Sequence, residues 1–281
     1  MKTVSIRKRS RIIEKELLAP DIYRMSFETE LCGEAEPGQF VLVYPPGGSR
    51  LLGRPLCIAD VSAAGNKRKL TIVFRTVGGG TREIADCAAG DELYIEGPLG
   101  HGYPLDEGTV KDKDIVLLGG GLGAPSLLFL AKLLAGKAGI LDKAGQAYDI
   151  ERIAVVLGYR DSSLKHFLAD DFKALGIKTL IATDDGSEGL KGNVLQAMEG
   201  AGLTAGLIYA CGPMPMLSAV KKYSTQKKIP AYVSLEEHMA CGVGVCLGCV
   251  VRTSEKDAHS NVNNARVCTE GPVFDIQKVE I

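Results

Sequence analysis

Four cysteines crowd together near the end of the 281-residue chain, and their spacing constrains the fold more than any other feature. They follow the order Cys241-x4-Cys246-x2-Cys249, then eighteen residues, then Cys268. This is the spacing of a plant-type [2Fe–2S] site, where four thiolates must converge on a small volume inside a tightly wrapped loop. We therefore predict that these four cysteines bind an iron–sulfur cluster.

The residues between the cysteines fit a loop that wraps a cluster. Gly242, Gly244 and Gly248 allow backbone conformations closed to other residues and can bring N–H groups close to the sulfurs. The apolar residues of the loop are expected to keep water away from the cluster: Val243, Val245 and Leu247. The alternative is a zinc site with four cysteine ligands. Zinc sites usually pair two short Cys-x2-Cys units, whereas here the second half supplies one cysteine.

The other four cysteines and the bulk composition indicate a cytoplasmic protein. Single cysteines among apolar residues suit reduced core thiols, and the chain has four of them: Cys32, Cys57, Cys87 and Cys211. The basic N-terminus is not followed by an apolar segment of signal-peptide type, and no apolar run approaches the ~18 residues of a membrane span. A net charge of −1 gives no general case for binding nucleic acid or an anionic membrane. A metal or cluster site is thus favoured over a disulfide framework.

The first part of the chain, residues 1–108, is predicted to form a small antiparallel β-barrel. Its β-rich segments are separated by turns that contain glycine or proline: Ile22–Phe27, Gln39–Val43, Leu56–Asp60 and Leu70–Arg75. One short helix is expected over Thr81–Cys87, with Thr81 as its N-cap.

The pattern changes at Lys111, and residues 109–230 are predicted to form a doubly wound α/β domain. Apolar strands alternate with helix-like segments there: Asp114–Leu118, Ile153–Tyr159, Lys178–Ala182 and Leu207–Cys211. Gly136–Gln146 is expected to be an inserted surface connection. Residues 231–281 form a third, small module with the cysteines and a polar loop at Thr253–Asn264.

Two glycine-containing turns in the second domain are candidate nucleotide sites. The sequence GGGLGA, with Gly119, Gly120, Gly121 and Gly123, follows a strand and precedes a helix, so its backbone can approach a pyrophosphate at the helix N-terminus. An acidic residue about twenty positions further on is not evident, which indicates a subtype other than the standard Rossmann site. Cys211 and Gly212 of ACGPM leave room for a planar ring, although an ordinary turn with a core cysteine is the favoured explanation of that segment when no other context is considered.

Two arginines in the barrel domain could clamp a diphosphate. Arg54 stands just before a strand, and Arg75 is followed by the glycine loop that enters the short helix. Two guanidinium groups and a helix N-terminus suit a diphosphate. Each feature alone is most often a solvated arginine or a turn, but a redox cluster downstream suggests that the ligand is a flavin. Glu236 and Glu237 could face that flavin or water.

At this point a family resemblance emerges. The motifs RPLCI, FRTVGGGT, GGGLGAPS, ACGPMPM, and SLEEHMACGVGVCLGC with RVCTEGPVF occur in order over residues 3–275. They resemble the electron-transfer subunits of dihydroorotate dehydrogenase B, which are ferredoxin-reductase-like flavoproteins. The resemblance implies three parts, namely an FAD-binding barrel, a pyridine-nucleotide domain and a C-terminal [2Fe–2S] module.

The resemblance also implies which residues bind the cofactors. FAD would be contacted by Arg54, Pro55, Leu56, Cys57, Val73, Phe74, Arg75, Gly80 and Thr81. The cluster would be held by Cys241, Cys246, Cys249 and Cys268, and NAD(H) would be served by Gly119–Ser126 and Cys211–Met214. One departure concerns Cys57, because the family usually has Ser or Thr there and a thiol is a weaker hydrogen-bond donor than a hydroxyl.

The function implied is electron transfer between NAD(H) and a partner chain. That partner would be the FMN-containing catalytic subunit that oxidises dihydroorotate in pyrimidine synthesis, in a heterotetramer of two plus two chains. No acid/base set stands out in the sequence, so no catalytic residue is predicted here, and cofactors would carry the chemistry. Two alternatives remain, namely a flavin/iron–sulfur subunit of an NADH-linked ferredoxin oxidoreductase or sulfide/sulfite reductase, and a zinc-stabilised nucleotide-binding module.

Overall fold

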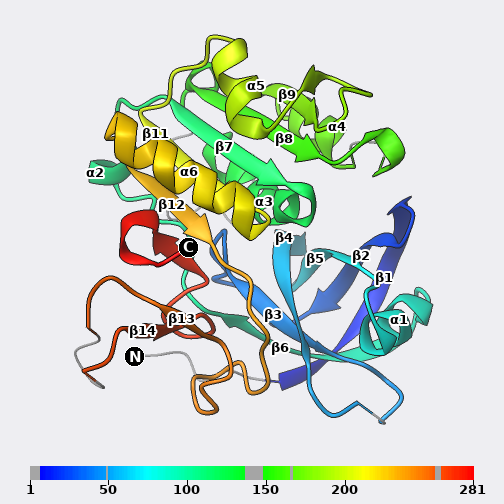
Figure 1. Cartoon of the computed structure of the whole chain (residues 1–281). Helices are drawn as coiled ribbons and strands as arrows, with labels where there is room; N and C mark the ends of the chain where they lie inside the picture. The colour runs from blue at the N-terminus through cyan, green and yellow to red at the C-terminus, as the bar shows by residue number, and fades with distance from the viewer. Residues whose placement is uncertain (1–6, 49, 137–147, 165–166, 257–260) are drawn as a thin grey trace.

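The computed structural model describes residues 7–48, 50–136, 148–164, 167–256 and 261–281. It consists of a closed barrel, a seven-stranded sheet and a two-stranded ribbon (Figure 1). In Figure 1 the sheet lies above the barrel, and the ribbon, β13 and β14, lies beside the barrel near the bottom. The predicted barrel and doubly wound sheet are both confirmed. None of the helices in the described ranges has the length and apolar character needed to cross a bilayer.

The barrel strands follow the order β1-β2-β5-β4-β3-β6, and β1 closes the ring by pairing with β6. Their bounds are Arg7–Ala19 (β1), Ile22–Thr29 (β2), Phe40–Tyr44 (β3), Arg54–Ala64 (β4), Lys67–Arg75 (β5) and Glu92–Leu99 (β6). The four predicted strands are confirmed as β2 to β5. Strands β1 and β6 were not predicted. In β1 few apolar residues face inward, whereas β6 alternates regularly, with Leu93, Ile95 and Leu99 buried.

The short helix α1 (Gly79–Asp86) begins two residues earlier than predicted. Its N-cap is Gly78, so the expectation that Thr81 caps the helix was wrong. Thr81 stands in the first turn, where its hydroxyl accepts hydrogen bonds from the backbone N–H groups of Val77 (3.0 Å) and Gly78 (3.2 Å). The hydroxyl therefore closes the turn from inside the helix.

The seven-stranded sheet has the order β10-β9-β8-β7-β11-β12-β15, and only β15 runs antiparallel to its neighbour. The bounds are Ile115–Gly120 (β7), Ile153–Tyr159 (β8), Lys178–Thr183 (β9), Leu190–Lys191 (β10), Leu207–Cys211 (β11), Ala231–Ser234 (β12) and Val273–Asp275 (β15). Strands β12 and β15 come from residues 231–281, so this segment completes the sheet besides carrying the cysteines.

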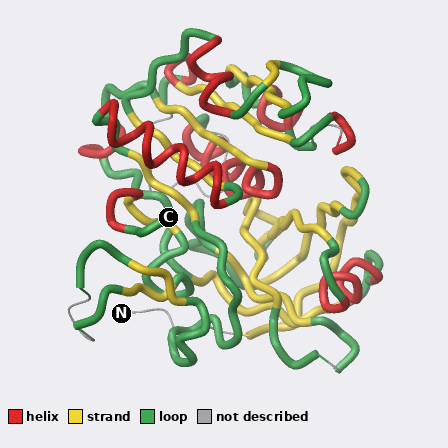
Figure 2. The backbone as a smooth tube through the Cα atoms, viewed as in Figure 1, coloured by secondary structure: helices red, strands yellow, loops and turns green. Residues whose placement is uncertain are grey.

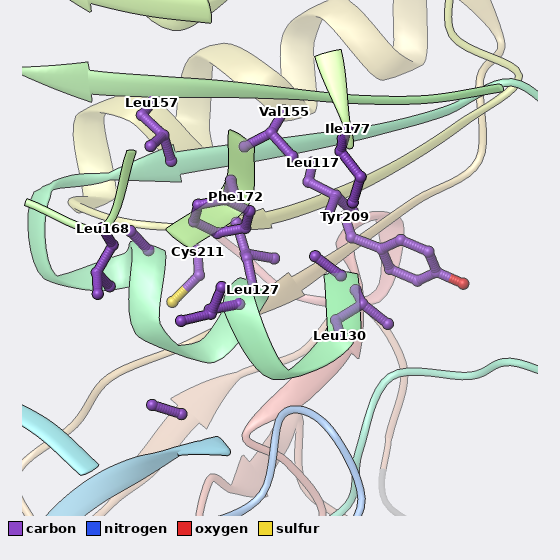
Figure 3. Close-up of a cluster of buried hydrophobic side chains, with 14 of the residues drawn as sticks. Leu117, Leu127, Leu130, Val155, Leu157, Leu168, Phe172, Ile177, Tyr209 and Cys211 are labelled. Carbon is purple, nitrogen blue, oxygen red and sulfur yellow. The ribbon is translucent and has the colours of Figure 1, made fainter. Parts of the chain in front are cut away.

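Helices cover both faces of the sheet. Helices α3 (Ala124–Leu134) and α4 (Ala169–Ala174) pack on one face, and α5 (Val194–Gly200) and α6 (Met214–Lys227) pack on the other. Figure 3 shows the hydrophobic core between the sheet and the first pair of helices. Leu127 and Leu130 of α3 and Phe172 of α4 lie there against β7 and β8. Pro125 stands in the first turn of α3, as predicted. The tube in Figure 2 shows how these helices flank the strands.

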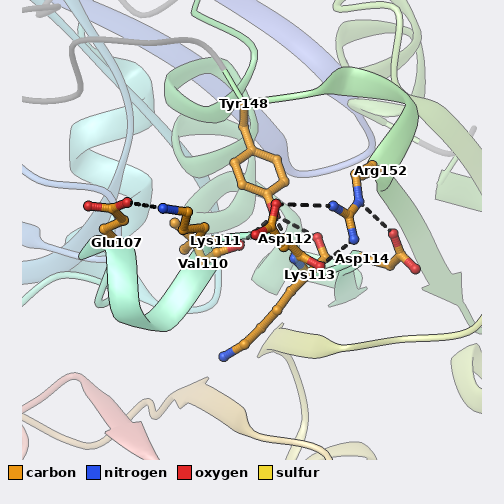
Figure 4. Close-up of polar contacts among 8 residues, drawn as sticks. All are labelled: Glu107, Val110, Lys111, Asp112, Lys113, Asp114, Tyr148 and Arg152. Atoms are coloured by element: carbon orange, nitrogen blue, oxygen red, sulfur yellow. Dashed lines mark hydrogen bonds and ion pairs between the residues drawn. The ribbon is translucent and has the colours of Figure 1, made fainter.

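A group of polar contacts fixes the entry from the barrel into the sheet (Figure 4). The short helix α2 (Glu107–Val110) precedes β7, and the Tyr148 hydroxyl accepts a hydrogen bond from the Lys113 backbone N–H (3.0 Å). Arg152 donates from Nε to Asp114 Oδ1 at 2.9 Å. These bonds tie the segment before β7 to the segment before β8, so both strands start in register.

The C-terminal ribbon pairs β13 (Val250–Arg252) with β14 (Asn264–Arg266). Single 3-10 turns complete the elements: Gly121–Gly123, Ile150–Arg152, Ser162–Leu164 and Ile276–Lys278. The predicted surface connection at Gly136–Gln146 lies outside the described residues, apart from Gly136, as do residues 257–260 of the polar loop.

Candidate functional site

The cysteine loop directs backbone N–H groups at sulfur. Cys241 Sγ accepts hydrogen bonds from the N–H groups of Val243 (3.5 Å), Val245 (3.3 Å) and Cys246 (3.4 Å). Cys246 Sγ accepts one from the N–H of Gly248 at 3.4 Å. Protein surroundings oppose the ionisation of Cys241, but the hydrogen bonds from Cys246, Val243 and Val245 outweigh this effect and lower its pKa to about 6. The loop is therefore built to stabilise thiolate.

The four cysteines come together as two pairs. The Cys246 side chain hydrogen-bonds that of Cys241, and the Cys249 side chain hydrogen-bonds that of Cys268. The ribbon creates the second pair, because β13 and β14 are antiparallel and the Val267 N–H donates to the Cys249 carbonyl at 3.0 Å. Burial, with the neighbouring Cys249, raises the pKa of Cys268 to about 12. All eight cysteines are free, so no disulfide competes for these thiols.

The two thiol pairs suit the ligand set of a two-iron cluster. Across the described ranges, no three His, Cys, Asp or Glu side chains are grouped closely enough to hold one metal ion. A [2Fe–2S] cluster divides its four cysteine ligands between two irons, so it needs pairs. Thr269 supports this fit, because its buried hydroxyl has no hydrogen-bond partner among the described residues. That hydroxyl lies 3.1 Å from where a Cβ on Gly244 would stand, at the edge of the same loop.

The loop glycines act as predicted at two positions of three. Gly242 (φ +68°) and Gly244 (φ +82°) adopt the left-handed conformation that favours glycine. The third left-handed residue is Leu247 (φ +56°), while Gly248 has no positive φ. Gly248 serves the loop through its N–H to Cys246 instead.

The apolar side chains of the loop do not cover the cysteines, and that expectation was wrong. Val243, Val245 and Leu247 are 41%, 79% and 60% exposed. The reason is the direction of the backbone, since the N–H groups turn inward to the sulfurs and the side chains consequently point outward. The cysteine side chains range from buried Cys249 and Cys268 to exposed Cys246.

The barrel wall opens where the predicted flavin motifs lie. The β4–β5 ladder ends at the pair Ile58↔Ile72. Residues 54–57 of β4 consequently pair only with β3, and residues 73–75 of β5 pair only with β2. The two motifs thus stand on opposite sides of one opening. Each of Arg54, Pro55, Leu56 and Cys57 is partly open to solvent, as expected for a strand that a ligand covers.

Two arginines lie directly over the start of α1. A Cβ on Gly79 would stand 2.1 Å from Arg50 Nη2, and one on Gly80 would stand 2.3 Å from Arg54 Nη2. The missing side chains at Gly79 and Gly80 leave space that the two guanidinium groups occupy beside the first helical turn. Cations and N–H groups at one place suit a diphosphate. Arg50 was not predicted as a site residue, and only its sequence proximity to Arg54 could have suggested it.

Of the predicted flavin-contacting residues on β5, only one has an exposed side chain. The Val73 and Phe74 side chains are 5% and 2% exposed, and Phe74 stacks on Tyr23 with ring centroids 5.9 Å apart. Arg75 is the exposed member of the three. A ligand in the opening can therefore meet the Arg75 side chain, but it can meet only the backbone of the other two.

The two glycine turns of the sheet domain pack against each other at the carboxyl ends of β7 and β11. A Cβ on Gly123 would stand 2.0 Å from the Cys211 carbonyl oxygen, and one on Gly212 would stand 3.0 Å from Gly120 Cα. These glycines allow turn-to-turn contact. Gly121 differs from them, since it has φ +51° and open space around its missing Cβ. In the GGGLGA turn, Gly121 is thus the glycine that faces a possible ligand.

The sequence did not predict whether Glu236 faces the flavin or water. It follows β12 by two residues, and its carboxylate acts on the thiols of both Cys57 and Cys211. Cys57 belongs to the barrel and Cys211 to the sheet, so Glu236 stands at the seam between the two. No local pattern distinguishes it from Glu237, because only the packing of the barrel against the sheet brings the three residues together.

The chain is similar to proteins with known descriptions over nearly its whole length. Residues 236–280 match the family model of the iron–sulfur cluster binding domain of dihydroorotate dehydrogenase B. A dihydroorotate dehydrogenase B (NAD(+)) electron transfer subunit from Shouchella clausii is 35% identical over 270 residues, which cover 95% of this chain and 96% of that protein. The subunit of the same description from Geobacillus thermodenitrificans is 36% identical over 270 residues, again 95% and 96% of the two chains.

Solved structures share the architecture. One of an NADH-dependent reduced ferredoxin–NADP oxidoreductase, studied for flavin-based electron bifurcation, matches with a TM-score of 0.77 and 26% identity over 100% of this chain and 91% of that chain. The ferredoxin reductase in carbazole 1,9a-dioxygenase matches with a TM-score of 0.62 and 16% identity, covering 82% of this chain and 68% of that one. The second likeness concerns the fold alone.

Proposed function

The chain belongs to the family of dihydroorotate dehydrogenase B electron-transfer subunits, and from this we propose that it passes electrons between NAD(H) and a partner catalytic subunit. FAD and a [2Fe–2S] cluster supply the redox chemistry when bound, the flavin exchanging a hydride with nicotinamide and the cluster carrying single electrons. The observation that carries the proposal is the cysteine loop, with two thiol pairs and N–H groups turned toward sulfur.

The chain's own residues then have distinct tasks. Arg54 and the first turn of α1 bind the diphosphate, and the open stretch of β4 supports the flavin. Gly121 admits the nucleotide close to the backbone before α3. Cys241, Cys246, Cys249 and Cys268 hold the cluster.

The cluster loop also touches the barrel close to the flavin motif. A Cβ on Gly242 would stand 2.6 Å from Leu42 Cδ1 of β3, and Leu42 is paired with Pro55 of β4. The loop is thus one strand away from the proposed flavin site. A short separation between the two redox groups favours direct electron transfer between them.

We further propose that the partner is an FMN-containing subunit that oxidises dihydroorotate in pyrimidine synthesis, in an assembly of two plus two chains. The carbon chemistry would then lie entirely in the partner. The exposed Val245 and Leu247 on the cluster loop support contact with another chain, because apolar side chains beside a redox group suit a docking surface.

One set of measurements tests the proposal. The purified chain should be coloured, with about two irons and one FAD per chain. It should reduce an artificial acceptor with NADH, and it should convert dihydroorotate only after the catalytic subunit is added. A colourless protein that contains zinc would refute the redox assignment, and dihydroorotate oxidation by the single chain would refute the division of labour.

A second candidate function has one observation in its favour. The NADH-dependent reduced ferredoxin–NADP oxidoreductase matches the whole chain with a TM-score of 0.77. A flavin subunit of a ferredoxin-linked enzyme would share this fold and these cofactors. Co-purification decides between the two, since an FMN protein supports the dihydroorotate system and a larger flavoprotein with further iron–sulfur centres supports the ferredoxin system.

A further inference from the structure

Thr269 carries a hydroxyl group that is buried and has no hydrogen-bond partner among the residues that the structure describes. In the chain it directly follows Cys268, one of the four proposed cluster ligands. Burying a hydroxyl without a partner is costly, because the group gives up the hydrogen bonds that it forms in the unfolded chain. A group in this state is suited to meet a bound ligand.

The turn that carries Thr269 is held without help from this hydroxyl. The Arg266 carbonyl oxygen accepts hydrogen bonds from the N–H groups of Thr269 (3.2 Å), Glu270 (2.8 Å) and Gly271 (3.4 Å). The Arg266 side chain also donates from Nε to Glu270 Oε2 at 2.8 Å. A threonine hydroxyl often bonds to the carbonyl three residues before it, but here that carbonyl already serves three N–H groups. The position of the hydroxyl is therefore fixed by the turn, while its donor remains unused.

This turn contacts the cysteine loop at Gly244. Arg266 donates from Nη1 to the Gly244 carbonyl oxygen at 3.3 Å. A Cβ on Gly244 would stand 2.9 Å from Thr269 Cγ2 and 3.1 Å from Thr269 Oγ1. Gly244 belongs to the loop that carries three of the proposed ligands, and Thr269 adjoins the fourth. The hydroxyl thus lies where the two segments that supply the ligands meet.

The missing acceptor for this hydroxyl is one that a cluster can provide. None of the four cysteine sulfurs is its partner in the described structure. A [2Fe–2S] cluster brings two inorganic sulfides into the space between its ligands, and each sulfide can accept a hydrogen bond.

We propose that the Thr269 hydroxyl donates a hydrogen bond to a sulfide of the cluster and so raises the reduction potential of the cluster. This inference rests on the proposed function, because it requires that the four cysteines hold a [2Fe–2S] cluster. The reduced cluster carries one more negative charge than the oxidised cluster, so a donor stabilises the reduced form more strongly.

The test compares variants that keep or remove the hydroxyl. The full chain is purified with its cofactors, and the potential of the cluster is measured by redox titration with detection by electron paramagnetic resonance. Thr269→Val keeps the shape of the side chain and removes the donor. It should favour the oxidised cluster about three- to tenfold, which lowers the potential by about 30–60 mV. Thr269→Ser keeps the hydroxyl and should retain most of the original potential.

Thr253→Val is the matched control in the same C-terminal module. The Thr253 hydroxyl already donates to the Glu255 carbonyl oxygen at 2.7 Å, so its removal should leave the potential unchanged. Thr269→Ala, which removes the same hydroxyl with less bulk, takes the place of Thr269→Val if the valine variant assembles no cluster.

A second measurement detects the hydrogen bond itself. The resonance Raman bands of the bridging Fe–S bonds shift in D2O when an exchangeable proton is bonded to a sulfide. The shift should be larger in the unmodified chain and in Thr269→Ser than in Thr269→Val.

The inference is overturned if Thr269→Val keeps the original potential, if Thr269→Ser loses as much as Thr269→Val, or if Thr253→Val lowers the potential equally. Bridging bands of the unmodified chain that do not shift in D2O overturn it whatever the variants do. Failure of the proposed function looks different, since the unmodified chain would then contain no two-iron cluster and would give no cluster signal on reduction.

Discussion

Gly244 illustrates how much of the candidate cluster site depends on single backbone angles. Its φ of +82° and its closeness to Thr269 leave no room for a side chain. The spacing of the cysteines and the need for glycine at 242 and 244 were predictable from the sequence, because both follow from the chemistry of wrapping four sulfurs. The outward direction of Val245 was not, since it depends on which way the peptide groups turn, and hydrophobicity alone carries no such information.

Gly244→Ala should therefore disturb the cluster loop. The new Cβ would stand 2.9 Å from Thr269 Cγ2 in a left-handed conformation, at a cost of about 1–3 kcal/mol. We expect a lower iron content and a lower melting temperature. Gly248→Ala is the control, because its Cβ would lie 3.4 Å from Cys246 Sγ without a positive φ. Equal iron content in the two variants would contradict this account of the loop.

Cys268→Ser should remove one of the four proposed ligands without changing the shape of the ribbon. Cys268 is 1% exposed beside Cys249, so a serine fits there but provides a poor ligand for iron. Iron and acid-labile sulfide per chain should fall severalfold, and the FAD content should stay the same. Cys87→Ser is the matched control, because that side chain only hydrogen-bonds the Glu83 carbonyl at 3.4 Å. Full iron content in Cys268→Ser would refute the ligand assignment.

At the scale of elements, the strands that are buried on both faces could be predicted from the sequence, whereas strands with one charged, solvent-exposed face could not. Strand β8 was predicted with its observed bounds because seven consecutive residues form a nearly continuous apolar run. Strand β1 was missed because its thirteen residues alternate imperfectly and expose many charges. Helix α1 was shifted because glycine, rather than Thr81, precedes its first turn. The bounds of β1 and α1 depend on contacts with residues that are distant in the sequence, so a local sequence pattern cannot predict them fully.

Two ion pairs join the barrel to the helices of the sheet domain. Arg24 of β2 contacts Asp171 of α4, and Lys132 of α3 contacts Asp60 of β4, both at 2.6 Å. The four side chains are 21–29% exposed, so water screens them only in part. These pairs link the barrel to the sheet domain.

Asp60→Asn should lower the free energy of unfolding by up to about 1 kcal/mol in urea at low salt. The difference from the unmodified chain should shrink at high salt, because salt screens the pair that the variant lacks. Asp170→Asn is the control, since Asp170 is 93% exposed in its pair with Lys173, and we expect it to change stability by less than about 0.5 kcal/mol. A larger loss in Asp170→Asn than in Asp60→Asn would contradict this role for the interdomain pairs.

At the scale of the whole molecule, all the candidate cofactor residues meet along one seam. The carboxyl ends of β7 and β11 carry the nucleotide turns, the opening between β4 and β5 carries the flavin motifs, and the cluster loop lies on β3. The order of the motifs was visible in the sequence. Their convergence was not, because it depends on how the barrel docks on the sheet and on β12 and β15 bringing the C-terminal segment back.

The cluster loop contacts β3 at Leu42, so its exposed face is where electrons would pass between the cluster and a partner chain. Val245 is 79% exposed on that face. Val245→Asp should weaken the complex with the proposed catalytic subunit by about tenfold or more, since a buried charge at an interface costs at least ~1.4 kcal/mol. Isothermal titration calorimetry measures the change. The iron content should stay at its original level, because the side chain points away from the cysteines.

The matched control is Leu17→Asp on β1, which introduces the same charge at a residue that is 60% exposed. Leu17 lies at the end of β1 beside Tyr23 of β2, whereas the cluster loop contacts Leu42 of β3. We therefore expect this control to leave the affinity unchanged. If both variants bind the partner normally while retaining iron, the partner contacts another face, and electrons must leave the cluster by another route. If only Val245→Asp loses affinity, the outward apolar residues serve the partner, which explains why this loop exposes the side chains that a solitary cluster protein would bury.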